Sequence, residues 1–309
     1  ARLWLSAEDA LADNPDLLRC DVCVVSDGSL PDVNQPVLDY GLRGLAPSME
    51  LIVTGPQRDL HSGHYGGTTH NPIHALAHIL AGLHDAQGRV TVPGFYDGVA
   101  PLTDEERAVL TPIASWFESD WRTVTGAPQP WGDPDYRIHE RIMVRPTLEF
   151  NGIIGGYTGE GGKTVIPSRA SAKITCRLVP HQDPLHVFEA VRDHINRLTP
   201  PTVRAELLYV EDGSPAVVID RHSEAVRAAD AAYRKGWGVA PLYAREGGSI
   251  PVVSALMQHL DTQMVLMPFG YKGGGAHSTN EYVVWEMFHK GIDTMLYFYD
   301  EIAQRLHKE

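Results

Sequence analysis

The sequence has few cysteines, an acidic rather than a basic charge balance, and no long apolar run. Three cysteines in 309 residues are too few for a disulfide framework. Cys20 and Cys23 form a C-x-x-C pair, but the apolar segment around them is typical of a buried strand and not of a redox or metal motif. No segment approaches the roughly 18 consecutive apolar residues of a membrane span, and the first residues do not form a signal peptide. These absences predict a cytoplasmic protein with no membrane partner.

The charge balance excludes a further class of partner. The chain has 26 Lys and Arg against 39 Asp and Glu, which gives a formal net charge of −13. Because phosphates repel an acidic surface, nucleic acid is not an expected partner. With 43% hydrophobic and 21% charged residues the composition is that of a globular protein, long enough for one large domain or two ordinary ones.

Strand-like and helix-like segments alternate along the chain, which indicates an α/β protein. A helix is expected to open at Ser6–Asp9, and residues 21–26 follow as a nearly continuous apolar run. Such a run is typical of a strand buried on both faces. Asp27 stands at the carboxyl end of that strand, where open α/β sheets place their ligand-binding residues.

A different sequence pattern extends from about Leu42 to Asp212. Apolar and polar residues alternate there, as in residues 170–178, which predicts a sheet with one buried and one open face. Two helices are predicted to start at Asn71-Pro72 and Asp183-Pro184, since Asn or Asp caps a free N–H and Pro has none. We interpret this region as an inserted α+β domain.

The rest of the chain again alternates helix-like segments with apolar, strand-like runs, as the first 42 residues do. The inserted domain is therefore expected to interrupt a discontinuous domain. We place this first domain at residues 1–42 and 213–309 and the inserted domain at residues 43–212. The expected elements of the last segment are a helix over 223–235, a helix after Pro251, a buried strand over 264–267, and a terminal helix from Glu281 with a capping box at Ser278–Glu281.

Two histidine-containing segments are candidates for chemistry in the inserted domain. The glycine-rich loop Asp59–Gly67 combines an acid, hydroxyls and His61, although a polar turn with surface histidines explains it equally well. His74 and His78 are spaced for chelation, but no third ligand is in view, so a solvated helix face is the better interpretation.

Two further segments could bind an anion. Gly161–Pro167 leads into a strand that carries Arg177, whose guanidinium could take a carboxylate on the open sheet face or form a cross-strand ion pair. Arg245–Pro251 places two glycines beside a helix start, which suits either a carboxylate site or a simple helix entry.

A fourth segment, Gly273–Glu281, combines a glycine-rich loop with His277 ahead of the expected capping box. The helix dipole would disfavour protonation of His277 there, which leaves a neutral imidazole able to ligate a metal.

Taken together and in this order, the four segments resemble the metallopeptidase family of carnosinase-like cytosolic non-specific dipeptidases, acetylornithine deacetylase and succinyl-diaminopimelate desuccinylase. The likeness runs over nearly the whole chain and looks closest to the dipeptidase branch. It implies an α/β fold in which a zinc-peptidase-like catalytic domain is interrupted by an α+β lid domain, and the lid domain forms a homodimer.

The resemblance also implies roles for single residues. Asp27 and His277 match one ligand each of two divalent metal ions, zinc or manganese, whose bridging water would attack the substrate carbonyl. His61 looks like the lid histidine that reaches the neighbouring subunit and stabilises the oxyanion. The positions that match substrate-holding residues are Thr164, Arg177, Gly248 and Ser249, with Arg177 as the anchor of the free carboxylate.

One departure from the family pattern changes the expectation. The family carries a His-x-Asp and a Glu-Glu pair earlier in the chain than Asp27, but no His-x-Asp precedes Asp27 here, and by alignment the Glu-Glu pair would fall just before Ala1. A single ligand per ion is fewer than the roughly three that such sites need, so we expect an incomplete catalytic domain. The predicted function is dipeptide hydrolysis, the alternative in the same family is an N-acyl amino acid deacylase, and the alternative of another class is a non-catalytic dimerisation or peptide-binding module.

Overall fold

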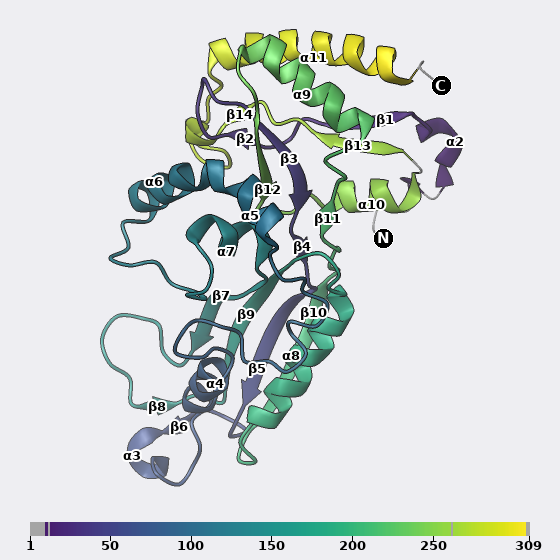
Figure 1. Ribbon diagram of the computed structural model, residues 1–309. Helices are drawn as coiled ribbons and strands as arrows, with labels where there is room; N and C mark the ends of the chain where they lie inside the picture. Colours follow the sequence, from purple (N-terminus) through teal and green to yellow (C-terminus); the bar gives the residue numbers. More distant parts are fainter. Residues whose placement is uncertain (1–9, 12, 261, 307–309) are drawn as a thin grey trace.

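Two sheets, each with its own apolar core, organise the residues that the computed structural model describes, which are 10–11, 13–260 and 262–306 (Figure 1). We call the part around the first sheet the upper domain and the part around the second sheet the lid domain. The expected helix start at Ser6–Asp9 lies outside the described residues. Within the described part, no helix is both long and apolar enough to cross a bilayer.

The upper domain contains a five-stranded mixed sheet in the order β1-β13-β3-β11, with β12 also paired to β3. Helices α9 and α11 lie side by side over it (Figure 1). Its strands are β1 (Val22–Val25), β3 (Val37–Leu42), β11 (Val217–Val218), β12 (Leu242–Glu246) and β13 (Gln263–Leu266), with a separate pair β2 (Ser29–Leu30) and β14 (Gly270–Tyr271). Its helices are α2 (Pro15–Leu18), α9 (Glu224–Trp237), α10 (Pro251–His259), η2 (Lys272–Gly274) and α11 (Trp285–Leu306).

The first strand differs from its prediction. All four residues of β1 are only half-buried, although their sequence is entirely apolar. The reason is position, because β1 pairs with β13 alone among the described strands and stands at the edge of the sheet. Asp27 follows β1 after one residue, at the carboxyl end, as expected.

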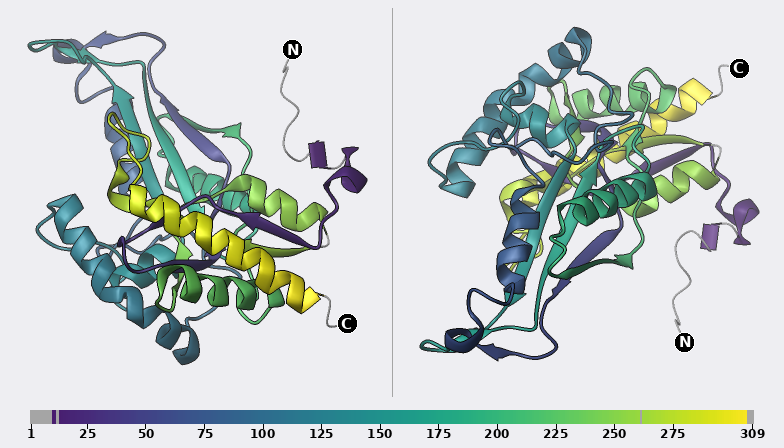
Figure 2. Two further views of the ribbon diagram at one scale, coloured as in Figure 1. Left: turned by 90° about the horizontal axis from the view of Figure 1, so that it is seen from above. Right: turned by 90° about the horizontal axis from the view of Figure 1, so that it is seen from below.

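The lid domain is a twisted antiparallel sheet with helices on one face, in which β5 and β7 flank the long strand β9 and β10 pairs with β5 (Figure 2). The predicted alternation is confirmed, since Met49, Leu51 and Val53 are buried against the helices. Its strands are β4 (Gly44–Leu45), β5 (Ser48–Thr54), β6 (Leu60–His61), β7 (Thr147–Gly155), β8 (Val165–Ile166), β9 (Arg169–Leu178) and β10 (Arg204–Glu211), and its helices are α3 (Ser62–Tyr65), α4 (Pro72–Ala81) and α8 (Pro184–Leu198).

The predicted helix starts of the lid domain are confirmed in detail. The side chain of Asn71 accepts a hydrogen bond from the Ile73 N–H, and the side chain of Asp183 accepts one from the His186 N–H. Both caps satisfy backbone donors that a helix start leaves free, and the Pro that follows each cap is already suited to the first turn.

Residues 101–146 form a helical insertion, which the sequence analysis assigned to the inserted domain without identifying its helices. Leu110, Ile113, Met143 and Val144 from this segment belong to the core of the upper domain and not to that of the lid domain. The insertion therefore packs on the upper domain, although the segments before and after it belong to the lid domain. Its helices are α5 (Asp104–Leu110), η1 (Thr111–Ile113), α6 (Ala114–Thr125) and α7 (Ile138–Val144).

Two of the segments that connect the domains, at Leu45 and Ser214, are hydrogen-bonded to each other. The N–H of Leu45 donates to the Ser214 carbonyl at 2.8 Å, and the N–H of Ser214 donates to the Leu45 carbonyl at 2.9 Å. The approach is so close that a Cβ on Gly44 would lie 2.5 Å from the Ser214 carbonyl oxygen, and one on Gly213 would lie 2.4 Å from that of Leu45. Only glycine fits at these two positions, so the bridge depends on both.

The predicted start of the terminal helix is wrong. Helix α11 begins at Trp285, and the Ser278 hydroxyl donates to the Gly275 carbonyl at 2.6 Å and caps no helix. The cause is local backbone conformation, since His277 and Asn280 have φ values of +62° and +63°, which belong to the left-handed region and interrupt a helix.

Candidate functional site

The tip of the lid domain brings two predicted residues together. His61 on β6 pairs with Val165 on β8, so Thr164 lies beside it, and the distance from Thr164 Oγ1 to His61 Nε2 is 3.4 Å. The Ser62 N–H also donates to the Thr164 carbonyl at 3.0 Å, which ties the two segments together. Both side chains are exposed. Two residues that were predicted separately, His61 and Thr164, are therefore neighbours.

The hydrogen bonds of His61 decide which ring nitrogen can donate. Its Nδ1 accepts from the Gly63 N–H at 3.0 Å. A neutral imidazole that accepts at Nδ1 carries its proton on Nε2, which leaves Nε2–H as the donor on the outer side of the ring. The His64 ring stacks on His61 with centroids 4.6 Å apart and fixes its plane. A neutral His61 can therefore donate to an oxygen of a bound molecule.

Asp59, the acid of the same loop, has a structural role. Its Oδ1 accepts from the backbone N–H of Ser168 at 2.8 Å and from the Ser168 hydroxyl at 3.0 Å. These two hydrogen bonds lower the pKa of the Asp59 carboxyl. A carboxylate held in this way fastens the tip loop to the start of β9 and is not available as a base.

Near the connection between the domains, a second pair of predicted residues meets. Arg177 on β9 of the lid domain donates from Nη1 to Ser249 Oγ at 2.7 Å, and Ser249 precedes α10 of the upper domain. The Ser249 hydroxyl also lies 3.3 Å from the Gly44 carbonyl. Arg177 has no ion pair among the described residues, so its cross-strand ion-pair interpretation is not supported there.

The glycines before Ser249 are occupied by the protein itself. The Gly248 N–H donates to the Glu246 carboxylate at 3.0 Å, and the Gly248 carbonyl accepts from the Arg43 N–H at 3.1 Å. Arg43, which sequence reasoning missed, also donates from Nε to the Gly247 carbonyl at 2.7 Å. Burial, with a contribution from the nearby Arg177, lowers the pKa of Arg43 to about 10. Two guanidinium groups thus converge beside this loop.

The two predicted metal ligands lie on neighbouring segments of the upper domain. The chain after Asp27 continues into β2, which pairs with β14, and the Gly270 N–H donates to the Gly28 carbonyl at 3.1 Å. His277 lies in the loop that follows β14. Because α11 begins eight residues after His277, the helix-dipole argument for its neutrality does not apply. Both side chains are exposed.

A carboxylate and an imidazole are donors that zinc and manganese accept, but their number falls short. Across residues 10–11, 13–260 and 262–306, no group of three His, Cys, Asp or Glu side chains could hold a metal ion. Since catalytic zinc sites generally use about three protein ligands, the described residues do not form a complete site.

A buried acid near this region was not anticipated. Asp39 lies in the middle of β3 with 5% of its surface exposed, and a Cβ on Gly28 would lie 3.8 Å from Asp39 Oδ2. Burial, with a smaller contribution from Glu246, raises the pKa of Asp39 well above its usual value. No pattern in the sequence predicted the burial of Asp39, because a single acid in an apolar strand is also found on a sheet face that is open to solvent.

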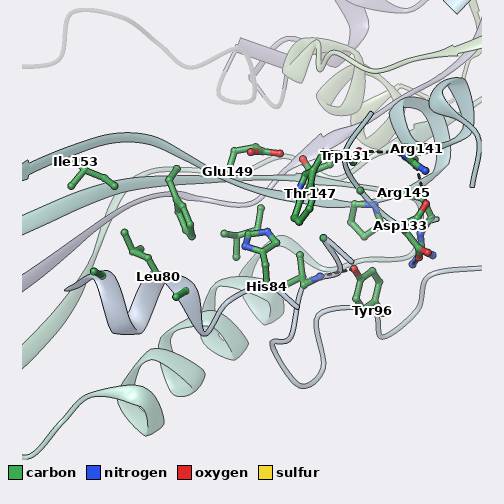
Figure 3. Close-up of a pocket in the computed structure, with 18 residues that line it drawn as sticks. Leu80, His84, Tyr96, Trp131, Asp133, Arg141, Arg145, Thr147, Glu149 and Ile153 are labelled. Atoms are coloured by element: carbon green, nitrogen blue, oxygen red, sulfur yellow. Dashed lines mark hydrogen bonds and ion pairs between the residues drawn. The ribbon is translucent and has the colours of Figure 1, made fainter. Parts of the chain in front are cut away.

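A pocket of about 600 Å³ lies elsewhere, between α4, β7 and the loop before α7 (Figure 3). None of the predicted site residues lines it. Its arginines are already engaged, because Arg145 lies over the Tyr96 and Tyr136 rings and Arg141 donates to backbone carbonyls (Figure 3). The pocket is therefore separate from both pairs of site residues.

Comparison with known proteins gives one family. The Cys-Gly metallodipeptidase DUG1 of Saccharomyces cerevisiae is 34% identical over 289 residues, which cover 91% of this chain and 59% of that protein. The Beta-Ala-His dipeptidase of Homo sapiens is 30% identical, with 92% of this chain and 56% of that protein covered. This chain thus spans about three fifths of the length of the curated relatives it matches.

Solved structures agree with the sequence comparison. The M20 family metallo-carboxypeptidase Sso-CP2 from Sulfolobus solfataricus superposes with a TM-score of 0.84 at 28% identity, over 96% of this chain and 66% of that chain. The profile of the M20 peptidase dimerisation domain matches residues 40–203, which contain the whole lid sheet except β10 together with the helical insertion. That match extends over more than half of the sequence, and the chain therefore belongs to the M20 peptidase family.

Proposed function

We propose that this protein hydrolyses dipeptides, with the substrate held between the lid and upper domains. The observation that carries the proposal is the pairing of Arg177 with Ser249, because it places a guanidinium from one domain beside a loop of the other. A dipeptide offers a free carboxylate that such a guanidinium can bind in a bidentate manner. The relatives named for Cys-Gly and β-Ala-His dipeptides support this substrate class.

His61 is proposed to donate its Nε2–H to the developing oxyanion, and to do so in a neighbouring subunit. Within one chain, β6 and α3 lie at the end of the lid domain that is far from β1 and β14 (Figures 1 and 2). A donor at that position cannot serve the site at Asp27 of its own chain. A second copy related by a two-fold axis would supply it.

A homodimer through the lid domain has a suitable surface in β7. This strand pairs with β9 alone among the described strands, and Ile153 and Ile154 are 63% and 64% exposed on it. A long edge strand with exposed apolar residues is a template for pairing with another chain. The family match to a dimerisation domain supports the same assignment.

Divalent metal ions, proposed as two zinc or manganese ions, would supply the activated water in this reaction class. Asp27 and His277 are proposed as one ligand for each ion. The remaining ligands are not among the described residues. The three free cysteines support the proposed cytoplasmic location.

The proposed function is tested with the protein expressed from its complete coding sequence and supplied with zinc or manganese. The substrates are a free dipeptide, the same dipeptide with an amidated C-terminus, and an N-acetyl amino acid. We expect hydrolysis of the free dipeptide, about 10- to 100-fold reduced for the amide because a charged hydrogen bond of about 1.5–3 kcal/mol is lost.

Two other outcomes would replace the proposal. Preferential hydrolysis of the N-acetyl amino acid would identify a deacylase of the same family. Dipeptide binding without turnover at saturating metal would identify a peptide-binding module, an alternative that the shortage of metal donors among the described residues favours.

A further inference from the structure

The aromatic helix α6 makes an unusual contact with the loop that carries His277. Lys272 Nζ lies 3.0 Å from Asp120 Oδ2 on α6. The same ammonium lies 4.6 Å from the centre of the Trp116 ring and 5.0 Å from that of Phe117. One cation therefore contacts a carboxylate and two rings of a single helix, which is more than a surface ion pair provides.

The aromatic rings are themselves fixed in place. Trp116 and Phe117 meet edge to face with centroids 5.2 Å apart, and both pack against the core of the upper domain. Asp120 follows Trp116 by one helical turn, so carboxylate and ring lie on the same face of α6. The helix thus presents a rigid receptor for the ammonium of Lys272.

Lys272 stands at the start of the loop that positions His277. It begins η2, and the loop then closes on itself, because the Tyr282 N–H donates to the Gly274 carbonyl at 2.9 Å and the Ser278 N–H donates to the Gly275 carbonyl at 3.0 Å. His277 has a φ of +62° inside this closed loop. A non-glycine residue in the left-handed region persists only where its surroundings hold it.

We propose that Lys272 is a positioning residue, which with Asp120 and Trp116 fastens the His277 loop to α6. The helix that receives Lys272 belongs to the segment matched by the dimerisation profile, although it packs on the upper domain. Helix α6, which belongs to the segment matched by the dimerisation profile, therefore contacts the loop that carries the proposed metal ligand His277. The inference depends on the proposed function only for the role of His277.

The test is hydrogen exchange of the amides of residues 270–282, measured by mass spectrometry on the protein expressed from its complete coding sequence, without added metal. Lys272→Met removes the charge and keeps the length of the side chain, and Asp120→Asn removes the carboxylate from the other side. We expect each to accelerate exchange in the loop about tenfold, which corresponds to about 1.4 kcal/mol. Lys272→Arg keeps the charge and should restore exchange to within about threefold of the unchanged protein.

Lys290 provides a matched control. It also combines an ion pair, at 2.8 Å from Glu286, with a ring contact, at 5.9 Å from the centre of Trp237, but it lies on α11. Lys290→Met should leave exchange of the loop unchanged. Because the readout is exchange and not turnover, failure of the proposed dipeptidase activity would leave this result intact.

Two results would overturn the inference. The first is unchanged exchange of residues 270–282 in both Lys272→Met and Asp120→Asn. The second is equal acceleration in Lys290→Met, since that would indicate general loosening of the domain. The double variant supplies a further criterion, because two partners in one contact should give no more acceleration together than the larger single change.

Discussion

The guanidinium of Arg177 and the hydroxyl of Ser249 are 2.7 Å apart, although 72 residues and a domain boundary separate them. Their contact places the positive charge of Arg177, a residue of the lid domain, at the upper-domain loop before α10. Arg43, at the same loop, donates to the Gly247 carbonyl and is held by the backbone. Arg177 is therefore the guanidinium that we propose exchanges its serine partner for a substrate carboxylate.

Replacement of Arg177 by Ala should weaken the binding of free dipeptides about 10- to 100-fold, because a charge-assisted hydrogen bond is lost. Arg177→Lys should recover little of this, since an ammonium does not reproduce the planar fork. Isothermal titration with a free dipeptide and with its C-terminal amide measures the effect. An equal loss for both ligands would place Arg177 away from the carboxylate.

Replacement of His61 by Ala should lower kcat for dipeptide hydrolysis about 10²- to 10³-fold, the usual effect of removing one oxyanion donor. The melting temperature should not change, because the His61 side chain is exposed. His64→Ala is the matched control, since His64 stacks on His61 but has no contact with Thr164 in the described hydrogen bonds. If both variants lose the same activity, the stacked pair and not the Nε2–H donor is the essential feature.

Replacement of Ile153 by Lys should shift the protein from dimer to monomer, because it places charge in the exposed edge of β7. Light scattering coupled to size-exclusion chromatography measures the mass. Leu185→Lys introduces the same change on α8, where Leu185 is 54% exposed, and should leave the dimer intact. A dimer that survives Ile153→Lys would exclude this edge as the interface.

Replacement of Asp39 by Asn should stabilise the protein at pH 8 more than at pH 4. The folded-state pKa of Asp39 is raised, so the folded state retains a proton that the unfolded state has released, and stability falls as pH rises from about 4 towards the folded pKa. Asn cannot ionise and removes that loss, which amounts to about 1.4 kcal/mol for each unit between the two pKa values. Thermal unfolding at both pH values measures it, and an equal change at pH 4 and pH 8 would show that the pKa of Asp39 is the same in the folded and unfolded states.

Local signals in the sequence were sufficient for much of the lid domain. The caps at Asn71 and Asp183 and the alternation in β5 depend on neighbouring residues, and the structure contains all three. Residues 101–146 could not be placed in this way. Their apolar positions suit any core, and nothing in the sequence indicates that they pack against the other domain.

The family resemblance predicted single site residues but not which of them are neighbours. Neither spacing nor the resemblance indicated that Thr164 lies beside His61 or that Ser249 lies beside Arg177. The capping box at Ser278–Glu281 satisfied a local rule and was overruled by the positive φ of His277 and Asn280. The burial of Asp39 and the half-burial of β1 depend on which strands are neighbours, which composition does not encode.

The hydrogen-bonded bridge between Leu45 and Ser214 has a consequence for how this architecture can change. The chain leaves the upper domain at Leu45 and returns to it at Ser214, and these two points are in direct contact, so a tight turn could join them if the segment between them were removed. The sheet of the lid domain could in this sense be exchanged or lengthened without redirecting a strand of its host. Loss of the whole segment would also remove residues 101–146 from the upper-domain core, and that packing ties the segment to one particular host.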